Sequence, residues 1–166
     1  MAHNGAGYDY KFILKWGIEH GLEPQRKIMQ GSRITYMTYK KFSIRFVDPL
    51  NFFSTPLAKL PEMFGLEDIV NCDFSHKFNT PENQDYISRI PAVEYYGVGN
   101  KSVKHALKFE GWYAEQAGIT NWDFKEEMKK YCIADVEILA RAVLSFRQLF
   151  YGKLNVDPFK YVTLPG

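Results

Sequence analysis

Apolar residues recur at helical spacing in several parts of this chain. Near the N-terminus, steps of three and four connect Tyr8, Phe12, Ile13 and Trp16, and Gly21 follows them. This pattern predicts a helix over roughly residues 8–20. Similar patterns predict a short helix over 56–64 and two longer helices over about 101–117 and 123–151, and the last of these is the most regular element in the sequence.

A strand-like pattern lies between the first two predicted helices. The stretch MQGSRITYMTYKKFSIRFVD is rich in β-branched and aromatic residues, and it is broken at Gly31-Ser32 and Lys40-Lys41. It predicts two or three strands joined by tight turns. Residues 67–100 are polar, with several prolines and glycines, and predict a long irregular segment of the kind that is often functional in a compact domain.

The composition is that of a packed globular protein. The chain has 166 residues, of which 46% are hydrophobic, so we expect one domain with a single core. No apolar run is long enough to span a bilayer and no signal-peptide pattern is present, which predicts an intracellular protein without a membrane partner. Cys72 and Cys132 lack the spacing of a zinc site.

Charge is distributed unevenly, although the formal net charge is only +2. No acidic residue occurs from Pro24 to Val47, and cations alternate there with aromatic residues. This basic strip consists of Arg26, Lys27, Arg33, Lys40, Lys41 and Arg45, interleaved with Tyr36, Tyr39, Phe42 and Phe46. Such a strip could follow a phosphate backbone, but a solvated hairpin face has the same pattern, so the sequence leaves both interpretations open.

Two aspartates lie at positions that continue the apolar side of a predicted helix, which we call its stripe. The stripe of the last predicted helix contains Ile138, Leu139, Ala142, Val143, Phe146, Leu149 and Phe150. Extended backward by steps of three or four, it reaches Asp135 and then Tyr131. In the first predicted helix, Phe12, Ile13 and Trp16 lead back to Asp9 in the same way. Both aspartates are therefore predicted to lie on buried helix faces.

A buried carboxylate needs a cation, hydrogen-bond donors or a metal as its partner. Two inward-facing carboxylates on facing helices suggest a shared divalent ion. Each aspartate also has a simpler interpretation. Asp9 could cap the N-terminus of its helix, and Asp135 could pair with Lys129 or Lys130 in a structural salt bridge.

The glycines of AHNGAGYDYKFIL do not complete a dinucleotide-binding motif. Gly5 and Gly7 begin a G-x-G-x-x-G pattern, but Tyr10 stands at the third glycine position. These two glycines are better interpreted as a tight entry into the first helix.

The same residues resemble those of a known protein family. HNGAGYDYKFIL, through Asn4, Tyr8 and Asp9, is similar to the second exonuclease motif of family B DNA polymerases. YCIAD, through Tyr131 and Asp135, resembles the third motif. DPLNFFSTPLAKLPEMFGL and HKFNTPENQDYISRIP resemble the protein-primed branch of that family, which serves linear plasmids, certain viruses and phages, and Maverick/Polinton transposons. The resemblance covers nearly the whole chain.

This resemblance implies an α/β, ribonuclease-H-like (DnaQ-like) exonuclease fold, with a mixed sheet flanked by helices. Residues 1–152 would be a partial 3′→5′ exonuclease domain, and residues 153–166 the start of the passage to a polymerase palm domain. Asp9 and Asp135 would bind two Mg²⁺ or Mn²⁺ ions, and Tyr131 would orient the attacking water. Asn4 and Tyr8 would hold the 3′ end of single-stranded DNA. A terminal priming protein would be a partner. The protein would be located in the nucleus or in the compartment of the replicating element.

The sequence departs from the family pattern in three ways. The Asp-x-Glu of the first exonuclease motif does not precede Asn4, Val70-Asn71-Cys72 takes the place of a lysine, and no palm motif follows Gly166. We therefore expect an N-terminally truncated fold, from a fragment or a decayed mobile-element gene, that belongs to a DNA polymerase but is inactive alone. The alternatives are a non-catalytic nucleic-acid-binding or interaction module and a remnant without function.

Overall fold

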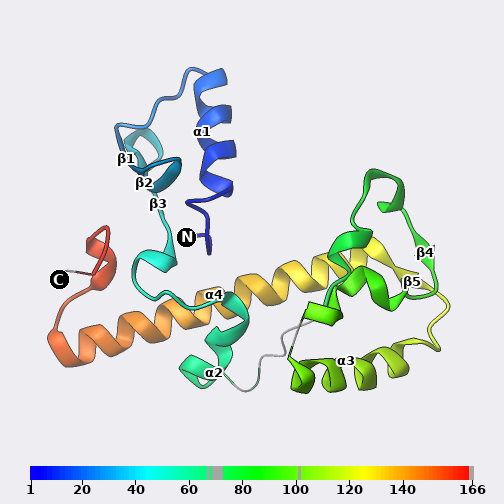
Figure 1. Cartoon of the computed structure of the whole chain (residues 1–166). Coiled ribbons are helices and arrows are strands. Elements are labelled where there is room, and N and C mark those ends of the chain that lie inside the picture. Colours follow the sequence, from blue (N-terminus) through cyan, green and yellow to red (C-terminus); the bar gives the residue numbers. More distant parts are fainter. Residues whose placement is uncertain (67, 69–72, 101, 165–166) are drawn as a thin grey trace. The chain divides into compact units, whose positions relative to one another are not determined.

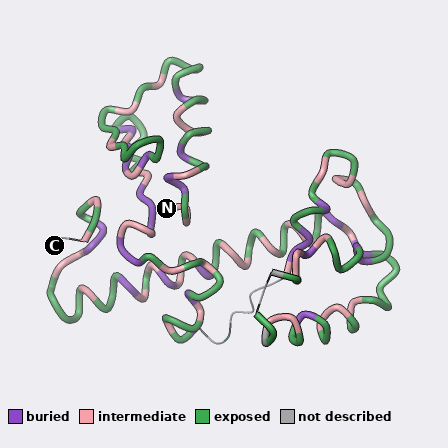
Figure 2. Tube along the Cα trace, in the orientation of Figure 1, coloured by how far each residue is buried: buried purple, intermediate pink, exposed green. Residues whose placement is uncertain are grey.

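The computed structural model describes residues 1–66, 68, 73–100 and 102–164, and these form two compact units (Figure 1). One unit contains Met1–Asp68 and Ile138–Gly166, and the other contains Ile69–Glu137. Each unit has a cluster of buried hydrophobic residues (Figure 2). The single core expected from the chain length is therefore replaced by two smaller ones.

The first unit begins with helix α1 (Asp9–Glu19), which packs on a three-stranded sheet. The strands β1 (Arg26–Gln30), β2 (Arg33–Tyr39) and β3 (Ile44–Val47) are antiparallel neighbours in that order. Their turns fall at Gly31, which has a φ of 57°, and at the 3₁₀ turn Lys40–Phe42. The predicted strands and their breaks are thus confirmed.

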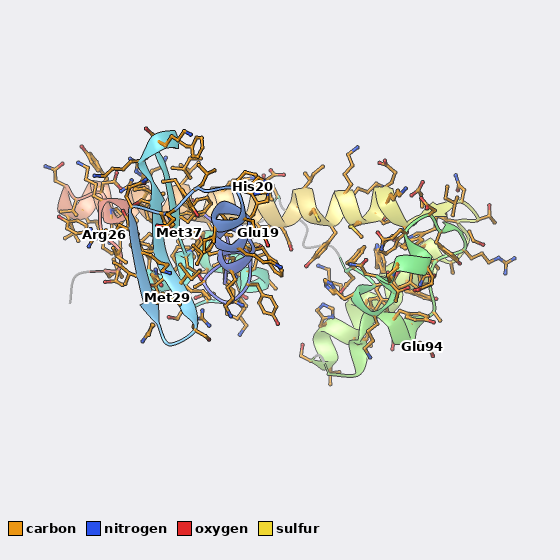
Figure 3. All side chains as sticks on the ribbon, turned by 90° about the horizontal axis from the view of Figure 1, so that it is seen from above. Glu19, His20, Arg26, Met29, Met37 and Glu94 are labelled. Atoms are coloured by element: carbon orange, nitrogen blue, oxygen red, sulfur yellow. The ribbon has the colours of Figure 1, made fainter. Side chains whose placement is uncertain are left out.

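The core between α1 and the sheet consists mainly of large side chains. Tyr10, Ile34, Met37 and Tyr39 are buried, and Phe46 packs against them. Met37 lies between the strands and α1 (Figure 3). The ring centroids of Tyr10 and Phe46 are 5.7 Å apart in an edge-to-face contact, a favoured geometry for aromatic pairs.

The predicted buried face of α1 is wrong. Phe12 and Trp16 are 69% and 55% exposed, whereas Tyr10 and Gly17 are buried and Ile13 is partly buried. Apolar residues occur on both sides of this helix, so helical spacing alone did not distinguish the packed side from the open one.

Gly17 brings α1 unusually close to the sheet. A Cβ atom at this position would lie 2.6 Å from the hydroxyl oxygen of Tyr39 and 2.8 Å from the carbonyl oxygen of Leu22. Both distances are shorter than van der Waals contact, so no other residue fits without movement of the helix or of the strand.

Helix α4 (Phe124–Leu154) contributes to both units. Within the first unit, Ile138, Ala142 and Phe146 are buried, as their stripe predicts, although Leu149 is 49% exposed. Phe146 contacts the rings of several aromatic residues at centroid distances of 4.7–6.5 Å: Phe52, Phe53, Phe64, Phe150 and Phe159. One of these, Phe64, ends the predicted short helix, observed as α2 (Leu60–Phe64).

The second unit has an aromatic core and little regular structure outside its helices. Phe74, Phe78, Tyr96, Phe109, Trp122 and Phe124 are buried there together with Ile90. Helix α3 (Val103–Gln116) and the two-residue strands β4 (Ile87–Ser88) and β5 (Trp122–Asp123) surround this core. Between residues 73 and 100, short 3₁₀ turns predominate, in agreement with the predicted irregular segment.

All strand pairs within the described residues are antiparallel. The mixed sheet that the family resemblance implies is therefore not observed in this part of the chain. The confirmed architecture is a combination of helices and small sheets.

A buried aspartate attaches the N-terminal segment to the end of β3. Asp48 is 0% exposed. Its Oδ1 accepts hydrogen bonds from the backbone amides of Asn4 (3.1 Å) and Leu50 (3.0 Å), and its Oδ2 accepts one from Ala6 (3.0 Å). These three donors satisfy a carboxylate that would otherwise be costly to bury.

We expect Asp48→Ala to lower the free energy of unfolding by about 3 kcal/mol or more, because three amides lose their acceptor. Asp48→Asn should cost less, since its carbonyl oxygen can still accept from Asn4 and Leu50. Urea denaturation would measure both losses. Asp85→Ala is the matched control because the Asp85 side chain is 85% exposed, so its loss should be small. Equal stabilities of the Asp48→Ala and Asp85→Ala proteins would contradict this assignment.

Candidate functional site

The segment before α1 is a series of tight turns. The Gly5 amide donates to the Ala2 carbonyl, the Gly7 amide to that of Asn4, and the Tyr10 amide to that of Gly5, each at 3.0 Å. A Cβ atom at Gly5 would lie 2.8 Å from the ring of Tyr10. Gly5 is therefore required for close packing on that ring, in agreement with a tight helix entry.

Asn4 is fixed through both its backbone and its side chain. Its φ of 58° lies in the left-handed region, which asparagine tolerates better than most residues. Its amide donates to Asp48, and its Oδ1 accepts a hydrogen bond from Arg33 at 3.1 Å. Asn4 nevertheless remains exposed at the surface of the first unit.

Tyr8 and Asp9 are also exposed, at the start of α1. Tyr8 occupies the N-cap position without a side-chain hydrogen bond, and Asp9 is the first helical residue. Asp9 forms no capping hydrogen bond with the described residues, so the capping interpretation does not hold. The buried position predicted for Asp9 is also wrong, because the side of α1 that it shares with Phe12 and Trp16 faces away from the core. The positive end of the helix dipole still favours its carboxylate.

Tyr131 and Asp135 are brought together one turn apart on α4. Burial raises the pKa of the Tyr131 hydroxyl, and its hydrogen bond to Asp135 and the negative charge of that carboxylate raise it further. The ring of Tyr131 stacks on Phe74, with centroids 5.0 Å apart, and meets His76 edge-on at 5.2 Å. Tyr131 therefore stays neutral at ordinary pH, one helical turn from the carboxylate of Asp135.

The lysines considered as partners of Asp135 form ion pairs with glutamates near the start of α4. Lys129 lies 3.9 Å from Glu126, and Lys130 lies 2.6 Å from Glu127. Asp135 itself is half-buried. Its carboxylate raises the pKa of the Tyr131 hydroxyl, and the structural salt bridge stays a prediction.

The predicted site residues form two groups. Asn4, Tyr8 and Asp9 belong to the first unit, and Tyr131 and Asp135 to the second. In the chain as far as it is described, no three His, Cys, Asp or Glu side chains gather as a metal-binding cluster. Each group offers one carboxylate, which is the oxygen ligand that Mg²⁺ and Mn²⁺ prefer.

Sequence reasoning missed Asp48 and placed Arg33 only in the basic strip, although both residues hold Asn4 in place. One signal was available for Asp48, because an aspartate followed by proline at the end of a predicted strand is typical of a turn or helix cap. The position of the family lysine, Val70-Asn71-Cys72, lies outside the described residues.

No helix in the described part of the chain combines the length and apolar composition needed to cross a bilayer.

Comparisons with known proteins place the whole chain in one family. The profile of DNA polymerase type B, organellar and viral, matches residues 1–166. A probable DNA polymerase of Neurospora intermedia is 29% identical over 99% of the chain, and one of Ascobolus immersus is 30% identical over 98%. A third, from Podospora anserina, is 25% identical over 73% of the chain.

The chain spans only 18% of the Neurospora protein and 14% of the Ascobolus protein. No solved structure matches. The match over all 166 residues nevertheless confirms the resemblance to family B polymerases, and the chain belongs to the family of organellar and viral type B DNA polymerases.

Proposed function

We propose that this chain is the 3′→5′ proofreading exonuclease region of a protein-primed DNA polymerase, with a ribonuclease-H-like fold. The observation that carries this proposal is the placement of Tyr131 and Asp135 one turn apart on α4, where the carboxylate raises the pKa of the tyrosine hydroxyl. A neutral tyrosine next to a carboxylate can hold a water molecule between them for attack on a phosphodiester. The anchored segment with Asn4, Tyr8 and Asp9 supports the same function.

Asp9 and Asp135 would each supply carboxylate oxygens to the metal site. Mg²⁺ or Mn²⁺, when bound, would activate the attacking water and stabilise the leaving 3′ oxygen. The exposed ring of Tyr8 would stack on a base of the frayed strand. The side-chain amide of Asn4 would form a hydrogen bond with the same strand. The substrate would be a single-stranded DNA 3′ end, and a terminal priming protein would be a partner of the whole polymerase in the nucleus or the compartment of the replicating element.

The 166-residue chain by itself is expected to cleave DNA little or not at all, because its motifs supply only two metal-binding carboxylates. The measurement is release of nucleotides from single-stranded DNA with Mn²⁺. Robust cleavage that Asp9→Ala abolishes would refute the inactivity and identify Asp9 as a metal ligand. Mn²⁺ binding, followed by electron paramagnetic resonance, gives a readout apart from activity, and it should weaken in both Asp9→Asn and Asp135→Asn.

Tyr8→Ala should weaken binding of an oligonucleotide with a free single-stranded 3′ end about fivefold or more, since stacking on one base contributes roughly 1 kcal/mol or more. Fluorescence anisotropy would measure this loss. Trp16→Ala is the matched control, because Trp16 is an exposed aromatic residue of the same helix and stacks on His20 at a centroid distance of 4.3 Å. Equal losses in both variants would argue against a specific role of Tyr8.

Tyr131→Phe should lower the free energy of unfolding by about 1 kcal/mol at neutral pH, because it removes the interaction of the hydroxyl with Asp135 that raises the tyrosine pKa. The pKa of Tyr131 is higher in the folded protein, so its contribution is fully present below the ordinary tyrosine pKa of about 10. It is lost as the pH rises beyond that value. Denaturation of both proteins at several pH values should show the difference shrinking in alkali, and a constant difference would contradict the pairing.

A second candidate is a non-catalytic nucleic-acid-binding or interaction module derived from a mobile element. The observation that favours it is that the described residues contain no gathered group of three metal-binding side chains. This module would bind DNA in a salt-dependent manner even after substitution of both Asp9 and Asp135, and it would bind no Mn²⁺.

A further inference from the structure

The two faces of the three-stranded sheet have different surroundings. Met37 points toward α1, whereas Arg26 lies on the other side of the strands (Figure 3). Arg26 is paired with Thr38 across β1 and β2, and Thr38 is paired with Arg45 across β2 and β3. Directly paired residues share a face of the sheet, so both arginines flank Thr38 on the face away from α1.

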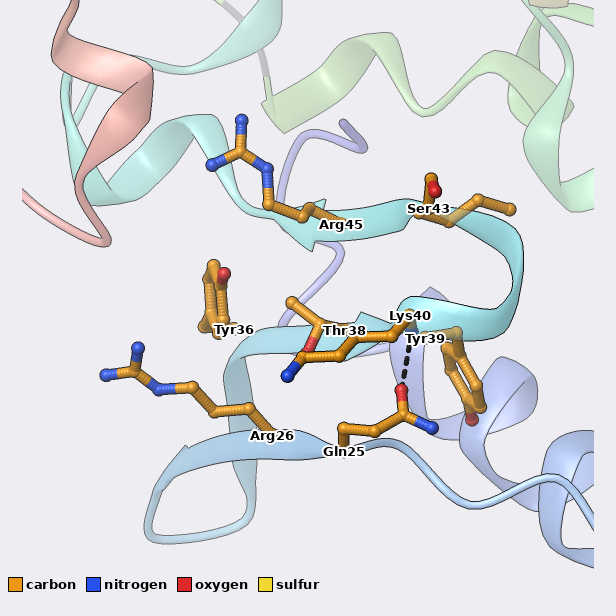
Figure 4. Close-up of a pocket in the computed structure, with 9 residues that line it drawn as sticks. Gln25, Arg26, Tyr36, Thr38, Tyr39, Lys40, Ser43 and Arg45 are labelled. Carbon is orange, nitrogen blue, oxygen red and sulfur yellow. Dashed lines mark hydrogen bonds between the residues drawn. The ribbon is translucent and has the colours of Figure 1, made fainter.

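This face contains a cavity of about 590 Å³ (Figure 4). Its walls include Gln25, Arg26, Tyr36, Thr38, Lys40 and Arg45. The guanidinium carbon of Arg26 lies 5.6 Å from the ring centroid of Tyr36, which is cation–π geometry. We call this surface, defined by Arg26, Tyr36, Thr38, Lys40 and Arg45, the basic face.

Among the described residues, no carboxylate neutralises the positive charge of the basic face. None of the described residues that line the cavity is acidic, and the nearest acidic residues in the sequence are Glu23 and Asp48. Asp48 is buried and accepts three amide hydrogen bonds. Within the described ranges, none of Arg26, Lys40 and Arg45 forms an ion pair, and all three are exposed.

We propose that the basic face binds the phosphate backbone of single-stranded DNA, through residues other than Asp9 and Asp135. The backbones of Arg26 and Arg45 are two strand spacings apart, about 10 Å, so the two guanidinium groups can contact different phosphates of one strand. The hydroxyl of Thr38 lies between them as a further donor.

The guanidinium of Arg26 favours a single strand over a duplex. Because Tyr36 supports it from one side, its plane offers the other side for stacking of an unpaired base. The bases of a duplex are stacked on one another and cannot reach this plane. The sequence left a solvated hairpin face as the other interpretation of the basic strip, and measurements of DNA binding distinguish the two.

The test is a salt titration of oligothymidylate binding to the 166-residue chain, followed by fluorescence anisotropy. Each phosphate contact to a single strand contributes about 0.7 to the magnitude of the slope of log K against log salt concentration. The double variant Arg26→Gln/Arg45→Gln should therefore reduce this magnitude by about 1.4. A matched double variant, Lys129→Gln/Lys153→Gln, removes the same charge from exposed positions on α4 and should leave the slope unchanged.

A conservative variant separates charge from stacking. Arg26→Lys should keep the slope of the unmodified chain but bind oligothymidylate more weakly, because an ammonium group cannot stack on a base. With an abasic oligonucleotide of the same length, Arg26→Lys and the unmodified chain should bind equally. An unchanged slope in Arg26→Gln/Arg45→Gln would overturn the proposal, and so would equal affinity for duplex and single-stranded DNA.

Discussion

The buried carboxylate of Asp48 is the interaction on which the arrangement of the first unit depends. Two of its three hydrogen bonds, from the amides of Asn4 and Ala6, join the end of β3 to the backbone of the N-terminal segment, which lies more than 40 positions earlier in the chain, and the third comes from nearby Leu50. Because Asn4 is attached in this way, the start of α1 is attached as well, and Tyr8 and Asp9 take a defined place at the surface. A single desolvated charge thus positions residues that it does not itself contact.

The second unit positions its part of the candidate site by different means. Tyr131 is held by aromatic packing on Phe74 and His76, and its hydroxyl is directed at Asp135. Backbone hydrogen bonds hold the group that contains Asn4, Tyr8 and Asp9. Packing of aromatic rings holds the group that contains Tyr131. The family match over residues 1–166 covers both groups, and the basic face of the first unit is proposed to contact the DNA strand through other residues.

Much of the secondary structure could be predicted because it depends on local pattern. The strands end where Gly31 and Lys40 interrupt them, and the stripe on α4 identifies Ile138, Ala142 and Phe146 as buried. The packed side of α1 could not be predicted, since apolar residues lie on both sides of the helix. The side that is buried is the one that contacts the sheet. The partners of Asp48 were also beyond local pattern, because they are backbone amides distant in sequence. The spacing of four residues placed Tyr131 and Asp135 on one side of a helix, but their mutual interaction was not predicted.

The contact between Gly17 and Tyr39 limits how this fold can change over evolution. The hydroxyl of Tyr39 and the carbonyl of Leu22 fill the space that any side chain at position 17 would need. A larger residue can appear at position 17 only together with a change at position 39 and a shift of the turn after α1. These positions should therefore covary among relatives, and glycine at the first should accompany a large aromatic residue at the second.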